Sequence, residues 1–425
     1  MTAPEYRFLH AADLHLDSPM LGLEEYEGAP VQELRGSTRR ALKNLVDLAL
    51  AEQAAFVLIA GDLYDGDWRD YNTGLFFISQ VRRLREAGIR VFIIAGNHDA
   101  ASRITKTLRM PEGVYLFPSD RAQTIRLDEL NVAVHGQSFP SASVRRDLSA
   151  GYPERVEGCF NIGLLHTCAT GREGHESYAP CTVEGLLSKG YDYWALGHVH
   201  RREILSEDPP VVFPGNAQGR HPGESGPKGC MLVKVAGSGE IKTAFRPLDV
   251  ARWFTLRIDA STAEDGYQAV DLVMDGLDGL LQANPGLPLA VRVEISGESK
   301  AHEDLASDVE KWTEEIRAGA LDAGGGMVYV EKVKIRTSTP FDLRRLWKGS
   351  GPVRELLDTI SDLEADPEEL KELGRVLEDL ERKLPRELKQ LGEASLFRDP
   401  DRIRGVLEQI RPMLVKRLIK EEGAQ

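Results

Sequence analysis

The sequence predicts a layered α/β domain, followed by a small α+β domain and a helical C-terminal region. From residue 7 to about 245, short apolar strands alternate with amphipathic helical stretches, which is typical of a sheet covered by helices. From about 250 to 338, three strand-like runs are separated by two helix-like ones. After about residue 340 the strand signals stop and leucines recur at helical spacing. We therefore expect domains at 1–245, 250–338 and 340–425.

Eight segments of the first domain read as strands, because each is a short apolar run that ends in turn or polar residues. They are YRFLHAAD, AAFVLIAGD, RVFIIAGN, NVAVHGQ, NIGLLHT, DYWALGH, PVVFPGN and GCMLVKV. Between them, RRALKNLVDLALAEQ and NTGLFFISQVRRLREAG repeat their apolar residues at helical spacing. The first domain should therefore have a layered sheet core with helices against it.

The second domain alternates the same two patterns. RWFTLRIDA, LAVRVEISG and MVYVEKVKIRT read as strands, EDGYQAVDLVMDGLDGLLQAN and EDLASDVEKWTEEIRAG as helices, and DAGGG at 322–326 as a flexible turn. In the third region, Asp366-Pro367-Glu368-Glu369 predicts a helix start, and Asp399-Pro400 repeats the device. The leucine stripes of LKELGRVLEDLERKL and IRGVLEQIRPMLVKRL leave two interpretations open: the helices pack on one another, or they present a face to a partner.

The composition is that of a soluble globular protein, with 425 residues of which 42% are hydrophobic and 28% charged. No apolar run approaches the roughly 18 residues of a membrane span. The amino terminus lacks the pattern of a signal peptide, so we expect a cytoplasmic protein. Cys159, Cys168, Cys181 and Cys230 have no CxxC spacing, which favours buried free thiols. The net charge of −14 argues against a surface covered with DNA-binding charge, but it leaves open a local basic or metal-bearing cleft.

The tetrapeptide GNHD at 96–99 lies where a predicted strand ends. Because Gly, Asn, His and Asp also form turns, the tetrapeptide alone fits a simple turn. Four other predicted strands end in comparable residues: Asp13-Leu14-His15, Gly61-Asp62, His166, and Gly197-His198-Val199-His200. Polar side chains at five strand ends predict a shared site, because the carboxyl ends of strands in an α/β sheet converge on one crevice.

The D-x-H and H-x-H spacings are suited to metal binding, since side chains two apart on an extended backbone point the same way. The candidate ligands are Asp13, His15, Asp62, Asn97, His166, His198 and His200. Seven ligands exceed the needs of one tetrahedral zinc ion, but they suit two ions if one carboxylate bridges them. Mixed imidazole, amide and carboxylate donors favour Mn, Fe or Zn over Mg or Ca. Two divalent ions outweigh the charge of two aspartates, so the site should attract a phosphate group.

Taken in order, D-x-H at 13–15, GD at 61–62, GNHD at 96–99, His166 and GHxH at 197–200 resemble the calcineurin-like metallophosphoesterase superfamily, over about residues 7–235. HAADLHLDSP, GDLYD and GNHD further resemble the SbcD-type DNA double-strand-break repair exonucleases. FPGNAQGRHPGESGPKGC at 213–230 is similar to the YhaO-like bacterial branch of that group. In protein Ser/Thr phosphatases the second block continues to Arg-Gly and the third ends in Glu. This chain has Tyr64-Asp65-Gly66 and Asp99 instead, which favours the nuclease branch.

The resemblance implies a β-sandwich flanked by helices, with a small capping domain, and it assigns roles to the site residues. One ion would be bound by Asp13, His15, Asp62 and His200, and the other by Asp62, Asn97, His166 and His198. As a catalytic residue, His98 would face the scissile phosphate, and Asp99 would orient its imidazole. Archaeal and eukaryotic relatives carry a second active-site histidine where this chain has Asp65.

The activity implied is a two-metal DNA exo/endonuclease in DNA repair, with Mn²⁺ as the expected ion. Related enzymes work with an SMC-like ATPase that binds helices after the capping domain, so we expect residues 340–425 to dock such a partner. The alternatives are a phosphodiesterase for a small nucleotide or phosphoprotein, and a scaffold without catalysis, against which the intact ligand set argues. The oligomeric state stays open, a homodimer included, and no membrane partner is expected.

Other basic residues and histidines are weaker candidates. Those that could bind phosphates are Arg103, Lys106, Arg201, Arg202, Arg220 and Lys228. Solvated surface charge is the commoner role for any single one of them. His135 and His221 could line the cleft, although we expect structural roles, and His10, His175 and His302 carry no signal.

Overall fold

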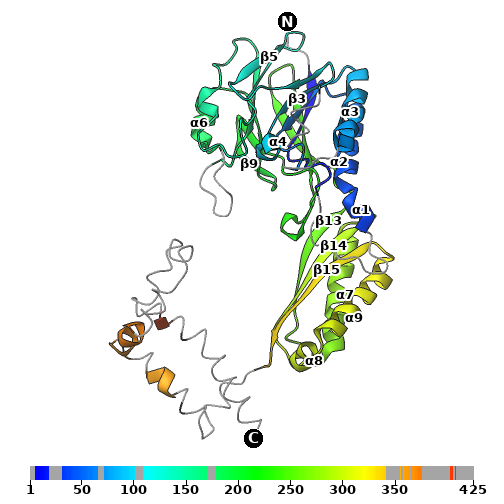
Figure 1. The fold of residues 1–425 in the computed structure, drawn as a ribbon, viewed down its shortest axis with the longest axis vertical. Coiled ribbons are helices and arrows are strands. Elements are labelled where there is room, and N and C mark those ends of the chain that lie inside the picture. The colour runs from blue at the N-terminus through cyan, green and yellow to red at the C-terminus, as the bar shows by residue number, and fades with distance from the viewer. Residues whose placement is uncertain are drawn as a thin grey trace. The chain divides into compact units, whose positions relative to one another are not determined.

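The fold is described from a computed structural model. It covers residues 5–18, 31–65, 71–101, 109–169 and 179–340, with short stretches between 355 and 375 and at 403, 404 and 407. The chain divides into two compact units, one of Met1–Gly297 with Ala301–Thr337 and one of Glu298–Lys300 with Ser338–Gln425. The first unit holds three sheets (Figure 1). Among the described residues, no helix combines the length and the apolar character needed to cross a membrane.

The first sheet has the order β12-β11-β1-β2-β3-β4. Its strands are β1 (Tyr6–Ala11), β2 (Phe56–Ala60), β3 (Arg90–Ile94), β4 (Val114–Leu116), β11 (Gly229–Val235) and β12 (Ile241–Pro247). The first four run parallel, and β11 pairs antiparallel with β1 and with β12. All five positions of β2 are buried. The unbroken apolar run FVLIA fits that position, because a parallel strand is covered on both faces.

The second sheet has the order β5-β6-β7-β8-β10-β9. Its strands are β5 (Gln123–Leu127), β6 (Val132–Gly136), β7 (Phe160–His166), β8 (Tyr193–Gly197), β9 (Glu203–Glu207) and β10 (Pro210–Phe213). Strands β6, β7, β8 and β10 run parallel, and β5 and β9 close the edges antiparallel. The central strands again read as continuous apolar runs, for the same reason.

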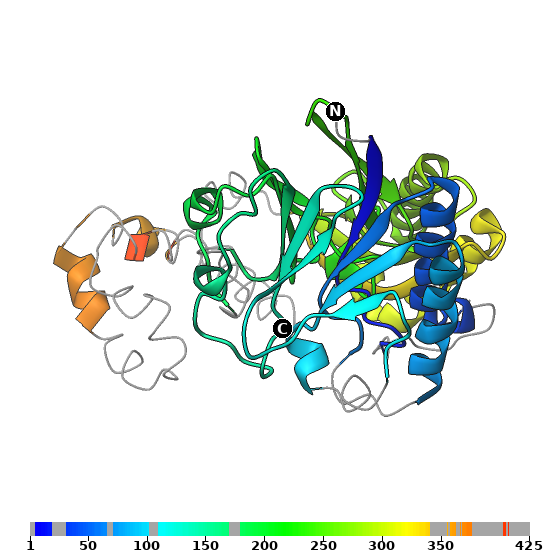
Figure 2. The ribbon, with the colours of Figure 1, turned by 90° about the horizontal axis from the view of Figure 1, so that it is seen from above.

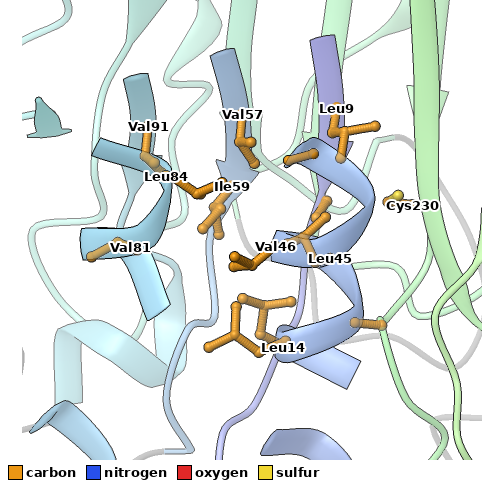
Figure 3. Packing of buried hydrophobic residues seen from close by; sticks show 14 of the residues in the cluster. Leu9, Leu14, Leu45, Val46, Val57, Ile59, Val81, Leu84, Val91 and Cys230 are labelled. Carbon is orange, nitrogen blue, oxygen red and sulfur yellow. The ribbon is translucent and has the colours of Figure 1, made fainter. Parts of the chain in front are cut away.

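The two sheets pack face to face. Phe8, Phe56 and Leu58 of the first sheet share a buried cluster with Ile162 and Tyr193 of the second. On the outer face of the first sheet lie α2 (Ser37–Ala51) and α3 (Tyr71–Glu86) (Figures 1 and 2). Their apolar stripes fill a second buried cluster against β1, β2 and β3 (Figure 3). The helix-covered β-sandwich expected from the sequence is therefore confirmed.

The third sheet, β13-β14-β15, is formed by β13 (Arg252–Asp259), β14 (Leu289–Glu298) and β15 (Val328–Ser338). One of its faces is covered by α7 (Gly266–Ala283), α8 (His302–Ser307) and α9 (Val309–Gly324) (Figure 1). The sequence predicts one helix where α8 and α9 stand. The break has a local cause, because the Asp308 side chain accepts a hydrogen bond from the N–H of Lys311 and begins a new helix. The predicted turn at 322–326 starts later than expected, since α9 continues to Gly324 and ends at Gly325 in the left-handed conformation.

All eight strands predicted in the first domain are present, as β1, β2, β3, β6, β7, β8, β10 and β11. Four strands of the two sheets, β4, β5, β9 and β12, were not predicted from the sequence. Of these, β4 has only three residues, and β5 and β9 are mostly polar and half exposed, so neither gives an apolar run. In the C-terminal region, Asp366 accepts a hydrogen bond from the N–H of Glu368, as the predicted helix start requires. The second predicted start, at Asp399, lies outside the described residues.

Candidate metal centre

Five loops meet at one edge of the sandwich, three following β1, β2 and β3 and two following β7 and β8. The first two run side by side, because Asp13 N–H donates to the Gly61 carbonyl at 3.0 Å and His15 N–H donates to the Asp62 carbonyl at 3.0 Å. The two sheets are joined here as well, since the N–H of His198 lies 3.0 and 3.1 Å from the two Asp13 carboxylate oxygens. Strand ends far apart in the sequence thus converge on a single place.

Four of the predicted ligands have a left-handed backbone. The φ angles are 51° at Asp13, 43° at His15, 50° at Asp62 and 100° at His198. Residues with a Cβ rarely adopt positive φ, and such conformations persist only where the surrounding structure imposes them. Backbone strain of this kind concentrates at functional sites.

Two glycines allow the loops to approach this closely. A Cβ at Gly61 would overlap the His166 ring, and a Cβ at Gly96 would overlap the Asp62 carboxylate. Gly61 also has a φ of 93°. The glycines of the GD and GNHD blocks therefore make room for the side chains that the metal centre needs.

The candidate ligands fall into three groups whose donor atoms lie within 4.8 Å of one another. The groups are Asp13 with His15 and His200, His15 with Asp62 and His98, and Asp62 with His166 and His198. His98 is not one of the seven predicted ligands. Asn97 adjoins the third group, with its Oδ1 3.0 Å from His166 Nε2. His15 links the first group to the second and Asp62 links the second to the third, so the seven predicted ligands form one connected cluster. Asp62 lies between its two ends, where a carboxylate can bridge two ions.

The hydrogen bonds of His166 indicate that a cation belongs beside it. Its Nδ1 lies 2.9 Å from the Ala60 carbonyl, which can only accept, so Nδ1 carries the proton. On a neutral ring, Nε2 then presents a lone pair to Asn97 Oδ1 at 3.0 Å and to Asp62 Oδ2 at 3.5 Å. His166 and Asp62 are buried, and Asn97 is partly buried. Because acceptors that face one another there are unfavourable unless a positive group lies among them, this arrangement fits a metal ion.

His200 and His15 bring two further imidazoles together. The Nδ1 of His200 lies 2.6 Å from Glu224 Oε1 and therefore donates to it. Its Nε2 then faces the Nε2 of His15 at 3.2 Å. Imidazole nitrogens are common ligands of divalent metal ions, and the Asp13 carboxylate lies in the same group, so this second position also fits a metal ion.

The pKa values of the site residues reflect the same crowding. Burial disfavours protonation of His166, but the Asp62 and Asp13 carboxylates outweigh burial and raise its pKa to about 9. Burial, with a smaller effect from Arg220, lowers the pKa of His15 to about 3. Burial would raise the pKa of Asp62, but His166 and His15 hold it below its usual range. Protons and a divalent cation therefore compete for these donors, as is usual for metal ligands.

His98 lies at the mouth of the site, with its side chain 40% exposed, beside a carboxylate that the sequence analysis did not assign to it. Its Nδ1 is 2.9 Å from Asp65 Oδ1, and this contact raises the pKa of His98. The expected role of Asp99 is thereby corrected. Asp99 is 2% exposed and accepts hydrogen bonds from the N–H groups of Leu63, Tyr64 and Gly96. It braces the loops that carry Asp62 and Asn97, while Asp65 orients His98.

Glu224 is a further residue of the site, and the sequence did not predict it. It comes from the glycine-rich segment at 213–230, is 4% exposed, and accepts hydrogen bonds from His200 and from Asn216 Nδ2, the latter at 2.9 Å. Burial would raise its pKa, but the His200 hydrogen bond and the nearby Arg220 hold it below its usual range. No periodic or spacing signal marks Glu224, because its partner lies 24 residues away.

The weaker candidates divide between the site and the scaffold. Arg220 lies in the site, with Nη2 3.1 Å from Glu224 and Nη1 3.6 Å from Asp65. Lys228 Nζ donates to the His200 carbonyl at 2.9 Å. Arg202 lies over the Phe245 ring, and Arg201 is exposed. The remaining residues have other partners or fall outside the description. His10 contacts Tyr193, His135 contacts Asn161, and His302 contacts Thr337. His221 accepts a hydrogen bond from the N–H of Gly223. Three candidates lie outside the described residues: Arg103, Lys106 and His175.

Comparison with known proteins places this site in a family. Residues 6–202 match the calcineurin-like phosphoesterases, and residues 253–338 match the middle domain of metallophosphoesterase YhaO. The uncharacterized metallophosphoesterase YhaO of Bacillus subtilis (strain 168) is 34% identical over 319 residues, which cover 74% of this chain and 75% of that protein. The DNA double-strand break repair protein Mre11 of Methanopyrus kandleri is 26% identical over 229 residues, and that of Sulfurisphaera tokodaii is 26% identical over 208. The chain spans about half the length of these two Mre11 proteins, at 49% and 51%.

The chain is thus a calcineurin-like metallophosphoesterase, a hydrolase of phosphoester bonds that uses divalent metal ions. Its similarity to YhaO extends from the sandwich to the third sheet, so within this class it stands in the YhaO-like branch.

Proposed function

We propose that this metallophosphoesterase is a Mn²⁺-dependent DNA nuclease with exo- and endonuclease activity. The observation that carries the proposal is the joined ligand set, in which Asp62 is shared between the groups on either side of it. Bound divalent ions would supply positive charge for a phosphodiester and a nucleophile for in-line attack. The mixture of imidazole, amide and carboxylate donors supports Mn²⁺ over Mg²⁺ or Ca²⁺.

The chain's own residues have distinct tasks in this proposal. The carboxylates of Asp13 and Asp62 and the imidazoles at the strand ends hold the ions. His98, exposed at the mouth and held by Asp65, faces the substrate and stabilises the leaving oxygen or donates its proton. Arg220, beside both Asp65 and Glu224, adds a cation that can contact a phosphate oxygen.

DNA is favoured as the substrate because relatives named as DNA double-strand break repair proteins align with about half of this chain. The second candidate is a small phosphodiester or a phosphoprotein, and the net charge of −14 supports it, since such a protein attracts polyanions poorly at long range. A catalytically silent scaffold is disfavoured by the complete ligand set.

The decisive assay compares substrates with one enzyme preparation. Purified protein with Mn²⁺, Mg²⁺ or Zn²⁺ is incubated with linear, circular and single-stranded DNA, beside a small chromogenic diester, with Asp62→Asn as the control for contaminating nucleases. We expect cleavage of DNA and of the diester with Mn²⁺. Cleavage of the diester without any cleavage of DNA would support the second candidate instead.

We also propose that the region 340–425 docks an SMC-like ATPase through its leucine-rich helices. The support is the amphipathic pattern and the resemblance, since most of this region lies outside the described residues. A protein of residues 1–340 should stay soluble and hydrolyse the diester, but lose ATP-stimulated cleavage of duplex DNA when the ATPase is added. A truncated protein that keeps full ATP stimulation would exclude docking through these helices.

A further inference from the structure

The segment between β10 and β11, residues 214–228, packs against the backbone of His200. Lys228 Nζ donates to the His200 carbonyl at 2.9 Å, and Asn216 N–H donates to the same carbonyl at 3.4 Å. Gly215 has a φ of 80°, and a Cβ there would lie 2.9 Å from that carbonyl oxygen. The backbone of this metal ligand is therefore held by residues that are not ligands themselves.

The same segment holds the His200 side chain through Glu224. One carboxylate oxygen lies 2.6 Å from His200 Nδ1. The other accepts from Asn216 Nδ2 at 2.9 Å and from the N–H of Arg220 at 2.7 Å. Both oxygens of a carboxylate that is 4% exposed are thus occupied, which fixes the direction in which Glu224 points.

The segment is also bonded to the start of the third sheet. Gln218 Nε2 donates to the Ala251 carbonyl at 2.7 Å, and its Oε1 accepts from the N–H of Val250 at 2.9 Å. Gly226 N–H donates to the Trp253 carbonyl at 3.1 Å. Gly219 packs so closely on Trp253 that a Cβ would lie 3.1 Å from its Cδ1. The support of His200 is therefore continuous with the chain that enters β13.

We propose that Glu224 is a positioning residue for the metal centre: it holds His200 with Nε2 directed at one of the two ions, and the bonds of its segment to β13 make the third sheet part of that support. A hydrogen bond from Nδ1 fixes the tautomer and the ring orientation of a ligand histidine and strengthens its bond to the metal. Among the described residues, Glu224 is hydrogen-bonded to His200 and to none of the other candidate ligands, so its effect should fall on one ion only.

The test measures Mn²⁺ binding to the full chain by calorimetry, after the protein has been stripped with chelator. For Glu224→Gln we expect the affinity of one ion to fall by about 10- to 100-fold while the other keeps its wild-type affinity. Glu224→Ala should weaken the same ion further, since the amide oxygen of Gln can still accept from His200. The melting temperature of the stripped Gln variant should fall by only a few degrees, because its amide nitrogen faces the donors of Asn216 and Arg220 while the rest of the segment keeps its bonds. The exposed Glu207→Gln on β9 serves as the matched control.

Two further variants separate this role from a general structural one. In a His200→Ala background, Glu224→Gln should cause no additional loss of Mn²⁺ affinity, because the residue through which it acts is gone. Arg220→Met removes the cation beside Glu224 and should leave Mn²⁺ binding as tight as in the wild type or tighter. The proposal is overturned if Glu224→Gln weakens both ions equally or neither, or if its effect persists unchanged without His200.

Discussion

The metal centre and the open face of the third sheet are both rich in charged side chains, but they pair them in opposite ways. On the third sheet, Arg292 makes two bonds to Glu331, at 2.7 and 2.8 Å, and Lys334 lies 3.0 Å from Glu294. In the metal centre, the buried His15 faces the partly exposed His200 at 3.2 Å, nitrogen to nitrogen. The third sheet brings opposite charges together across its strands. The metal centre instead brings together atoms that all bind metal ions.

The difference separates a structural charge cluster from a binding one. In a cross-strand ion pair, each charged group already has a partner of opposite charge. At a partly exposed surface such pairs contribute little to stability. Buried metal-binding nitrogens and oxygens that face one another are energetically costly unless an ion binds between them. Such groups are therefore retained where an ion is bound. The backbone agrees, because positive φ angles occur at Asp13, His15, Asp62 and His198 but at no residue with a Cβ among the described part of the third sheet.

The largest effect is expected at the shared carboxylate. Asp62→Asn keeps the size of the side chain but removes the charge that two ions share, so metal content and diester hydrolysis should fall together. The loss of activity should be about 100-fold or more, since metal ions supply several kcal/mol of transition-state stabilisation. Metal analysis of the dialysed protein checks this, and a variant with two ions and full turnover would show that Asp62 is not the bridge.

His98→Ala should have the next largest effect and should separate catalysis from metal binding. The side chain lies at the mouth and is held by Asp65, outside the seven predicted ligands. Turnover should fall by about 100- to 10,000-fold, as for a lost general acid, while both ions remain bound. Steady-state kinetics and Mn²⁺ calorimetry on the same sample measure the two properties, and release of an ion would make His98 a ligand.

An effect of intermediate size is expected at His10, a buried histidine whose two ring nitrogens both have hydrogen-bond partners. His10 lies between Tyr193 Oη at 3.0 Å and the Leu196 carbonyl at 3.1 Å, and burial lowers its pKa to about 3. The unfolded chain takes up a proton on this residue below about pH 6.5, whereas the folded protein does so only near pH 3. Stability should therefore decrease as pH falls from about 6.5 towards 3, with His10 contributing about 2–5 kcal/mol to the change.

The variant His10→Asn tests this contribution. Urea denaturation between pH 4 and 7, with chelator present, should give a shallower pH dependence for the variant than for the wild type. Equal slopes for His10→Asn and the wild type would mean that His10 is not kept neutral by the fold.

The smallest effect is expected on the third sheet. Arg292→Met removes the paired guanidinium but keeps an apolar stem over the strand, so unfolding free energy should fall by about 1 kcal/mol or less. Mn²⁺ affinity should not change, because this ion pair takes no part in binding a metal ion. Urea denaturation and calorimetry measure the two quantities, and a shift in metal affinity would mean that this face is coupled to the centre.

The sequence by itself determined the framework and the ligand types. Apolar runs that end in Asp, Asn or His reveal both the buried strands and their polar ends, because burial and chain direction are local properties of a strand. The convergence of these ends follows from the rule that parallel strands of a sheet end at one edge. Edge strands such as β5 and β9 escaped prediction because half-exposed strands need no apolar run.

Only the tertiary structure decided which carboxylate is hydrogen-bonded to which histidine of the site. The sequence placed Asp99 beside His98, yet Asp99 turns inward to three backbone N–H groups and Asp65, from another loop, takes that place. Likewise nothing in the sequence pointed to Glu224, whose partner His200 belongs to a different loop. The physical reason is that a hydrogen bond depends on the direction of two side chains across converging loops, and sequence spacing specifies direction only within a single strand or helix.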